Sequence, residues 1–213
     1  MSTRIPAVSA PMRKQPRQAR SRTTVDAIVQ AGARILGQRG WAGFTTNAVA
    51  EAAGVSIGSL YQYFPDKHAL IDAIRRQHLD DCLSAVQKPT TGKSLRRYVE
   101  ALVDDMIAVH AGNPGLHQVL LDEVLAAEGL RDPHSAFEKT YLGCHASAVA
   151  HYRGQATAAA ADALAGTLVS DALDGVIHNA IRRGELASTA VRSELVRLLL
   201  LYLRDVARRR APA

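Results

Sequence analysis

Apolar side chains near the start of the chain recur at the spacing of a helix that buries one face. Over residues 23–38 they follow the i, i+3, i+4, i+7 pattern, with Val25, Ile28, Val29, Gly32, Ile35 and Leu36 on one side. Gly40 follows as a suitable C-terminal stop. The pattern therefore predicts an amphipathic helix over residues 23–38.

Three further helical patterns follow before residue 90. Short helices are predicted after Thr45 and after Ser56, because hydroxyl side chains are good N-caps. The first of them ends at Gly54 and the second before Pro65. A fourth, longer pattern predicts a helix over residues 66–87.

The stretch from Pro89 to Gly92 interrupts the pattern and is the natural domain boundary. Beyond it, further helices are predicted at 94–111, 115–128, 133–153, 157–183 and 189–209. No segment alternates like a strand over more than a few residues, and there is no internal repeat. The fold class is therefore all-α, with an N-terminal group of three helices, a connecting helix and a larger C-terminal helical bundle, about nine helices in all.

Charge is distributed unevenly along the 213 residues. Residues 1–65 hold eight Arg and Lys against only Asp26 and Glu51, whereas the rest of the chain holds 18 charges of each sign. The net charge of +6 thus lies in the first third, as expected for a segment that meets a polyanion. Residues 1–20, which contain three prolines and no apolar periodicity, are expected to form a flexible basic arm.

Composition excludes several other classes of protein. No apolar stretch approaches the roughly 20 residues that span a bilayer, and the N-terminus lacks the apolar core of a signal peptide, so we expect a cytoplasmic protein. Cys82 and Cys144 show no metal-binding spacing, and no metal or cofactor is expected. No catalytic constellation or phosphate-binding Gly-rich loop is present, so we do not expect an enzyme.

The span from Thr45 to Phe64 has the layout of a helix-turn-helix. Ala50 provides the small residue where two helices approach, and Gly54 allows the positive φ that a tight turn needs. In the second helix Leu60 and Phe64 are expected to pack inward, which leaves outward-facing positions at Ser59, Tyr61, Gln62 and Tyr63. Small and polar residues at its start let this helix approach base edges in the major groove.

The same residues resemble a known family. The pattern Gly54-Val55-Ser56-x-Gly58-Ser59-Leu60-Tyr61-x-Tyr63-Phe64-x-x-Lys67-x-x-Leu70 is similar to that of the TetR/AcrR family of bacterial regulators. The resemblance covers about residues 22–72, with Trp41 where Tyr or Phe is commoner and Ile57 where a Lys, Pro or small residue often occurs. It implies a DNA-binding domain at 21–70, a connector at 66–87 and a ligand-binding and dimerisation domain at 88–213.

The resemblance also implies DNA contacts for particular side chains. Thr46 would hold a phosphate or base edge, with Thr45 beside it; Tyr61 and Tyr63 would reach the backbone, and Lys67 would neutralise a phosphate. Alternatively, Tyr61 is half-core, Lys67 is an ordinary surface lysine, and Gly58 is only tolerated near a helix end. The full predicted set comprises Thr45, Thr46, Ser56, Ile57, Gly58, Ser59, Tyr61, Gln62, Tyr63 and Lys67, with Arg17, Arg20 and Arg22 of the arm.

Two long helices near the C-terminus carry broad apolar stripes. The resemblance implies that they form a homodimer, which would place two recognition helices on one palindromic operator. The alternative is that both stripes are intrachain core. The predicted interface residues are Leu164, Leu168, Leu173, Ile177, Leu195, Leu199, Tyr202 and Leu203.

The central helices offer a few polar groups for a small-molecule effector, because ligand pockets combine apolar walls with a few converging polar groups. Each histidine could instead be an ordinary core histidine. A zinc site from His110, His117 and Asp122 or Glu123 is conceivable but is not the expectation. The candidate effector-binding residues are Met106, His110, His117, Phe137, Tyr141 and His145.

Together these features predict a DNA-binding transcriptional regulator, a homodimeric repressor that a small-molecule effector releases from its double-stranded operator. One alternative is an activator or a regulator gated by a partner protein. The other is a small-molecule-binding helical protein or enzyme whose helix-turn-helix is vestigial. The charge surplus in residues 1–65 and the intact helix caps argue against the latter.

Overall fold

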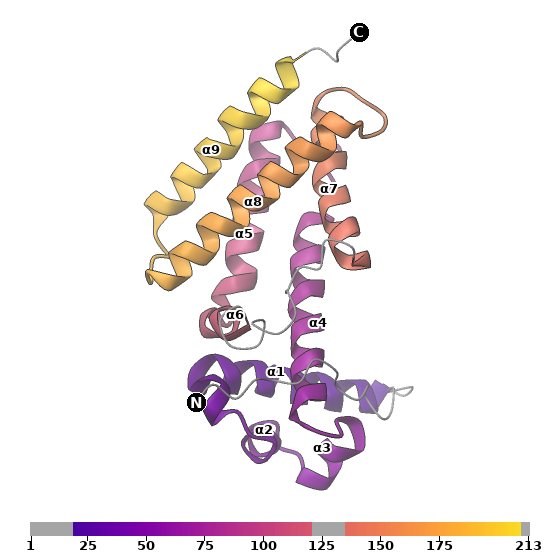
Figure 1. Ribbon diagram of the computed structural model, residues 1–213, viewed down its shortest axis with the longest axis vertical. Coiled ribbons are helices and arrows are strands. Elements are labelled where there is room, and N and C mark those ends of the chain that lie inside the picture. The colour runs from indigo at the N-terminus through magenta and orange to yellow at the C-terminus, as the bar shows by residue number, and fades with distance from the viewer. Residues whose placement is uncertain (1–18, 121–134, 210–213) are drawn as a thin grey trace. The chain divides into compact units, whose positions relative to one another are not determined.

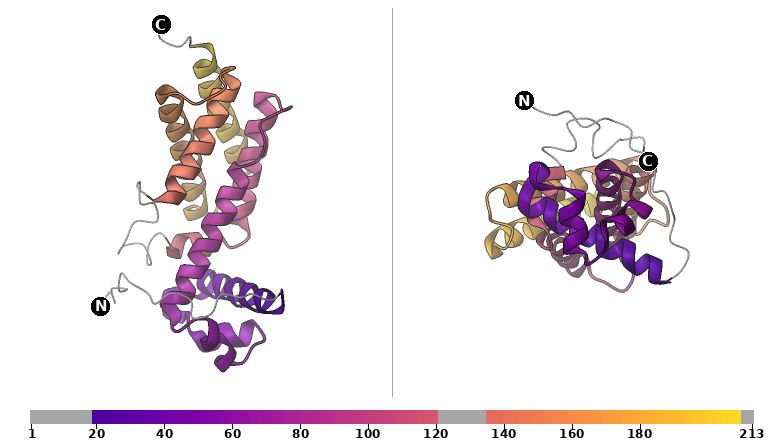
Figure 2. Two further views of the ribbon diagram at one scale, coloured as in Figure 1. Left: turned by 90° about the vertical axis from the view of Figure 1, so that its right-hand side faces the viewer. Right: turned by 90° about the horizontal axis from the view of Figure 1, so that it is seen from below.

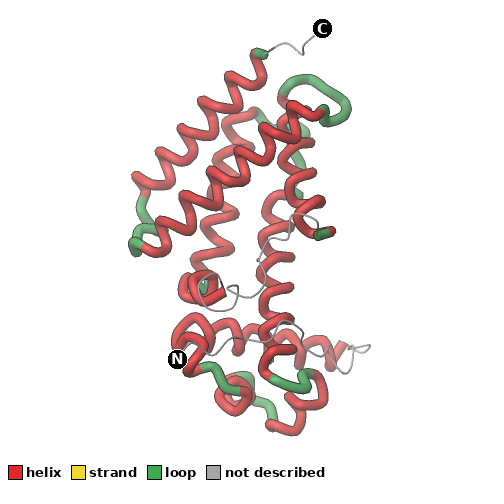
Figure 3. Tube along the Cα trace, viewed as in Figure 1, coloured by secondary structure: helices red, strands yellow, loops and turns green. Residues whose placement is uncertain are grey.

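The computed structural model describes residues 19–120 and 135–209, and in these two ranges every regular element is a helix (Figure 3). The nine helices found there agree with the all-α prediction (Figure 1). They are α1 (Ala19–Gly43), α2 (Thr46–Ala52), α3 (Ile57–Tyr63), α4 (Lys67–Val86), α5 (Leu95–Ala111), α6 (Pro114–Val119), α7 (Ala136–Tyr152), α8 (Ala160–Arg182) and α9 (Thr189–Arg208).

The helix boundaries differ from the sequence-based ones mainly at the ends. Helix α1 begins at Ala19, four residues earlier than predicted, and continues to Gly43 across a kink at Gly40. Gly40 still interrupts the helix, since its φ of 64° is non-helical. The helix predicted at 115–128 is described only as α6, because the residues from 121 onward lie outside the described ranges.

The chain divides into two compact units: it passes from the first to the second between Asp80 and Asp81, inside α4, and residues 113–130 belong to the first again. The first unit contains α1, α2, α3, α6 and most of α4, and its first three helices gather around the N-terminal end of α4 (Figure 2). Its core joins all of these helices and includes Ile28, Leu36, Phe44, Leu60, Phe64, Leu70, Ile74 and Leu120.

Helix α6 lies against α1 with almost no side chain between the two backbones. A Cβ atom added to Gly115 would lie 2.1 Å from the carbonyl oxygen of Gly37, and one added to Gly37 would lie 2.9 Å from the amide nitrogen of Leu116. Real Cβ atoms do not approach backbone so closely. The two glycines therefore permit this packing, which the apolar periodicity alone does not reveal.

The second unit contains the end of α4 together with α5, α7, α8 and α9. Its core is a single apolar cluster that includes Val86, Val99, Met106, Val149, Leu173, Ile177, Leu199 and Leu203. Helices α7 and α8 pack most closely, and α8 and α9 run side by side (Figure 1). Within the described residues, no helix combines the length and apolar character that crossing a membrane requires.

Replacing Gly166 by alanine is expected to lower the free energy of unfolding by about 2 kcal/mol, because the new methyl overpacks the α7–α8 contact. Its Cβ would lie 2.6 Å from the amide nitrogen of Ala146. The matched control is Gly143→Ala on α7, where a Cβ meets nothing within 4 Å. That exposed change should raise the free energy by up to about 1 kcal/mol through helix propensity. Urea unfolding measures both, and equal effects would contradict the packing argument.

Candidate nucleic-acid interface

The helix-turn-helix is held by side-chain caps at the start of each helix. The Thr45 Oγ1 accepts a hydrogen bond from the amide of Ala48 at 3.2 Å, and the Ser56 Oγ accepts one from the amide of Ser59 at 3.0 Å. Gly54 has a φ of 67° in the turn between them. Both predicted caps and the predicted turn glycine are thus confirmed.

Helix α3 presents a mixed apolar and polar face to solvent. Ile57 is 38% exposed and Tyr61 41%, and Gly58 and Gln62 are also exposed. Ser59 is half-buried, and its hydroxyl lies 2.8 Å from that of Ser56. A helix with small and polar residues at its exposed N-terminal end has the shape that enters the major groove.

Tyr63 is a correction to the sequence-based interpretation. The sequence pattern predicts an outward-facing side chain, but the Tyr63 side chain is only 8% exposed and belongs to the core of the first unit. The reason is helical geometry: Leu60, Tyr63 and Phe64 stand at i, i+3 and i+4, so all three share the buried face. Tyr61, on the opposite side, is the tyrosine of α3 that solvent reaches.

The hydroxyl groups of Thr46 and Tyr61 form a hydrogen bond of 3.1 Å. This contact joins the first turn of α2 to α3 on the exposed side of the module. It holds the Tyr61 ring beside Thr46, so that two hydroxyl groups are offered together. No sequence signal indicated the pair, because the residues are 15 positions apart and on different helices.

Lys67, at the first residue of α4, lies over an aromatic ring. Its Nζ is 3.7 Å from the centroid of the Trp41 ring, which is a cation–π contact. Trp41 in turn stacks on Phe44, with ring centroids 6.1 Å apart. The lysine is therefore positioned by the first unit's aromatic residues, a role that neither sequence-based interpretation anticipated.

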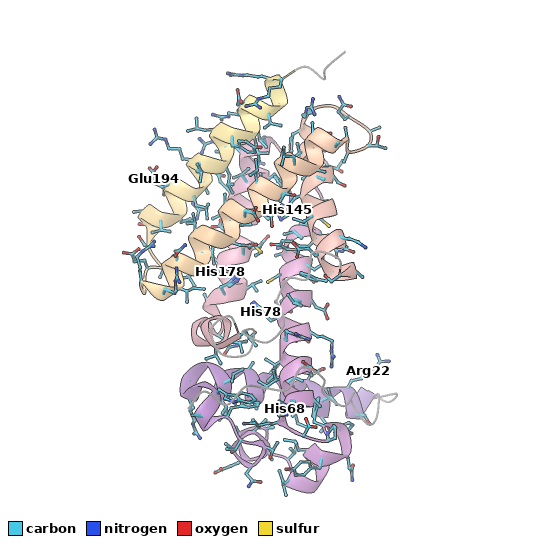
Figure 4. The ribbon with its side chains drawn as sticks, viewed as in Figure 1. Arg22, His68, His78, His145, His178 and Glu194 are labelled. Carbon is cyan, nitrogen blue, oxygen red and sulfur yellow. The ribbon has the colours of Figure 1, made fainter. Side chains whose placement is uncertain are left out.

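The predicted basic arm is only partly visible in the described ranges. Arg22 is exposed on α1 and is labelled in Figure 4. Arg20 lies in the first turn of α1, and its side chain is outside the described set, as is the whole of Arg17. Arg34, also on α1, donates a hydrogen bond of 3.5 Å to the carbonyl oxygen of Ala52 at the end of α2.

The candidate effector residues fall in the core of the second unit. Met106, His110, Tyr141 and His145 are buried, and Phe137 is half-buried. The Tyr141 ring stacks on Phe137 at 5.5 Å and meets His145 edge-on at 5.1 Å. The side chain of His117, on α6, is outside the described set. Five of the six candidates thus lie in the second unit, and three of them, Phe137, Tyr141 and His145, stand on successive turns of α7.

Sequence reasoning missed the acidic groups of this core. The Tyr141 hydroxyl donates a hydrogen bond of 3.5 Å to the Oδ1 of Asp174 on α8, and Glu138 is buried one turn before Tyr141. Burial lowers the pKa of His110, although its hydrogen bond with the Met106 carbonyl opposes the shift. No pattern signalled Asp174 or Glu138, because acids on amphipathic helices usually face water.

The predicted dimer residues divide into two groups. Leu164 and Leu168 are exposed, at 64% and 46%, and Tyr202 is half-buried. The remaining five are buried in the core of their own chain and are not available to a partner, so the prediction is wrong for Leu173, Ile177, Leu195, Leu199 and Leu203. On α9 the exposed leucines are instead Leu198 and Leu201.

Both parts of the chain match known protein-domain families. Residues 22–74 match the family described as bacterial regulatory proteins, tetR family, and residues 94–203 match the tetracyclin repressor-like C-terminal domain. A structure of a putative TetR-family transcriptional regulator from Rhodococcus sp. superposes with a TM-score of 0.67 at 24% identity, covering 85% of this chain and 99% of that one.

Two curated relatives are similar over part of their length. The HTH-type transcriptional regulator UidR of Escherichia coli is 26% identical over 119 residues, which are 56% of this chain and 58% of UidR. The HTH-type transcriptional repressor KstR2 of Rhodococcus jostii is 34% identical over 77 residues, 36% of this chain and 38% of KstR2. The matches to the N-terminal and C-terminal domains together show that the chain belongs to the tetR family of bacterial regulatory proteins.

Proposed function

We propose that the chain is a cytoplasmic DNA-binding transcriptional regulator that acts as a homodimeric repressor. The observation that carries the proposal is the capped helix α3, which exposes Ile57, Gly58, Tyr61 and Gln62 on the surface of the first unit. The family's description as regulatory proteins supports it, as do the relatives UidR, a transcriptional regulator, and KstR2, a transcriptional repressor. Residues 21–70 are proposed as the DNA-binding domain and residues 88–213 as the domain for effector and partner.

In this proposal the exposed start of α3 contacts base edges, and residues on either side of it contact the phosphate backbone of the duplex. Ser56, Ile57, Gly58, Ser59 and Gln62 would face the groove floor. Thr45, Thr46, Tyr61 and Lys67 would contact phosphates, aided by Arg17, Arg20 and Arg22. Tyr63 is left with a core role, since its ring is buried.

Release would follow from an effector that binds the second unit more tightly in one conformation than in another. The buried group of Met106, His110, Phe137, Tyr141 and His145 supports such a site, because it joins aromatic walls to polar atoms. A dimer would present two copies of the recognition helix α3 to a palindromic operator. Its proposed face is formed by Leu164, Leu168, Leu198 and Leu201.

Tyr61→Phe is expected to weaken binding to a selected duplex about 10-fold, because a hydrogen bond to a charged phosphate oxygen is lost. Thr46→Val should act in the same direction, since Thr46 holds the Tyr61 hydroxyl. The duplex is obtained by selection from random DNA, and affinity is followed by fluorescence anisotropy. Tyr152→Phe, in the second unit, is the matched control and should change nothing.

The salt dependence of the same binding tests the proposal as a whole. Affinity should fall by about 0.9 log unit per phosphate contact for each tenfold rise in salt. A flat response would contradict DNA binding itself. A steep response with an unchanged Tyr61→Phe variant would keep DNA binding and remove Tyr61 from the contacts.

A further inference from the structure

Among the described residues of the first unit, only two large apolar side chains are exposed, and both lie on α3. Ile57 is 38% exposed and Tyr61 is 41% exposed. The two stand four residues apart, so they share one face of the helix. Single exposed apolar side chains are ordinary on protein surfaces, so a role for Ile57 needs a second observation.

That observation is Gly58, the next residue, for which the folded chain has no internal use. Gly58 lies within α3 and does not have the positive φ that favours glycine. A Cβ atom added to it would meet only the Oγ of Ser56 among the described residues, at an ordinary 3.9 Å. Glycine also weakens a helix relative to alanine. A missing side chain beside Ile57 instead lets an outside surface come close to α3.

The hydroxyl groups around α3 are already engaged by the fold. Those of Ser56 and Ser59 lie 2.8 Å apart, and the Ser56 Oγ also accepts a hydrogen bond from the amide of Ser59. The Tyr61 hydroxyl is bonded to that of Thr46. The side chain of Ile57 therefore projects from the surface without a neighbouring hydroxyl that is reserved for the same base.

The composition of α3 narrows the choice of base further. The helix Ile57–Tyr63 contains neither Arg nor Lys, the side chains that most often contact guanine. Gln62, its exposed amide, stands five residues after Ile57 and thus about 140° away around the helix. Gln62 faces a different part of a groove, and Ile57 supplies only methyl and methylene groups at its own position.

The chemistry of the major groove determines what such a side chain can contact. Every base pair presents hydrogen-bonding groups there, but only thymine presents an apolar group, its C5-methyl. We propose that Ile57 is a specificity-determining residue that packs on the C5-methyl group of a thymine, so that each half-site of the operator carries an A·T pair at that position. The inference rests on the proposed function, because it assigns a base to the same DNA-binding surface.

The test removes one methyl group at a time from the DNA. Deoxyuridine pairs like thymidine but lacks the C5-methyl, so it replaces each thymidine of the selected duplex in turn. Binding of the full chain is followed by fluorescence anisotropy. At one position in each half-site the affinity should fall about 4-fold, as expected for the loss of one buried methyl group.

Ile57→Ala connects that position to the side chain. Because Ile57 is exposed, the variant should keep the wild-type Tm, which thermal unfolding checks. It removes three carbons, so the thymidine and deoxyuridine duplexes should then bind equally. Tyr61→Phe, on the same face of α3, is the matched control. It should weaken binding to both duplexes alike and keep the 4-fold difference between them.

Gly58→Ala tests the close approach of the DNA. The new methyl should raise the Tm through helix propensity, since it meets no tight contact within the chain. It should nevertheless weaken binding to the selected duplex about 10-fold, because it overfills the protein–DNA contact. A loss of affinity together with a higher Tm cannot come from unfolding. Wild-type affinity in Gly58→Ala would contradict the close approach that the Ile57 contact needs.

Two further results would overturn the role of Ile57 and leave DNA binding intact. One is a selected duplex in which no thymidine is sensitive to replacement by deoxyuridine. The other is a sensitive position whose 4-fold difference persists in Ile57→Ala, which would assign the methyl contact to another residue. A selection that enriches no duplex at all would instead contradict the proposed regulatory function, and the inference with it.

Discussion

Replacing Asp162 by alanine is expected to lower the free energy of unfolding by about 3 to 5 kcal/mol, since it breaks a buried ion pair. Asp162 is fully buried and accepts a hydrogen bond of 2.5 Å from the Arg153 guanidinium, whose side chain is 8% exposed. Its second oxygen accepts one of 2.8 Å from the amide of Ala159. The variant leaves a guanidinium buried without its carboxylate and one amide without its acceptor.

The pair joins the end of α7 to the start of α8, so its loss is local to the most closely packed helices of the second unit. Urea unfolding at neutral pH measures the effect, with Asp171→Ala on the exposed side of α8 as the matched control. That control should change the free energy of unfolding by less than about 0.5 kcal/mol. A loss from Asp162→Ala no larger than this would contradict the buried-pair argument.

Lowering the pH should remove the stabilisation that the Asp162 carboxylate contributes. Burial acts to raise the pKa of Asp162, but the amide of Ala159 and the guanidinium of Arg153 outweigh it, and the net pKa lies below its ordinary value. A carboxyl group with a lowered folded pKa stabilises above its unfolded pKa of about 3.9, and the contribution is lost as pH falls through the folded pKa. The difference between wild type and Asp162→Ala should therefore be constant near neutrality and shrink below about pH 4.

Features that depend on a few consecutive residues, such as the helix caps, could be predicted from the sequence. The hydroxyls of Thr45 and Ser56 cap the amides three residues ahead, and such contacts need only a few consecutive residues. The prediction for Tyr63 is wrong because only Leu60 and Phe64 are counted as the inward face, although Tyr63 stands three residues after Leu60 and shares that face.

Contacts between distant positions could not be predicted from one sequence. The contacts of Arg153 with Asp162 and of Thr46 with Tyr61 depend on how helices pack after they form. The leucines of α8 and α9 also show what one sequence cannot predict. Leucines lie on two sides of these helices, and apolar periodicity does not say which side packs against the chain's own core. The structure assigns Leu199 to that core and leaves Leu198 and Leu201 exposed.

Charging the exposed leucines of α8 and α9 is expected to separate the proposed dimer. Leu168 and Leu201 are 46% and 58% exposed, so glutamate at both positions remains solvated in a single chain. In a two-fold interface each substitution occurs twice, and four carboxylates would be buried without partners. Sedimentation should show a monomer at concentrations where the wild-type chain is dimeric, and affinity for the selected duplex should fall at least about 100-fold.

A matched double variant separates this effect from simple repulsion between glutamate and DNA. Gln87→Glu with Ser147→Glu adds two acidic side chains at exposed positions of α4's C-terminal flank and α7. It makes the same change in net charge but should leave the dimer intact. In the proposed dimer, Glu194 and Arg197 of α9, whose charged groups are 3.6 Å apart, would lie beside the face formed by Leu164, Leu168, Leu198 and Leu201. Glu194 is labelled in Figure 4. A dimer that survives Leu168→Glu with Leu201→Glu would place the interface elsewhere. Monomers that keep full operator affinity would contradict binding by both α3 helices of a dimer, because a single α3 would then suffice to hold the duplex.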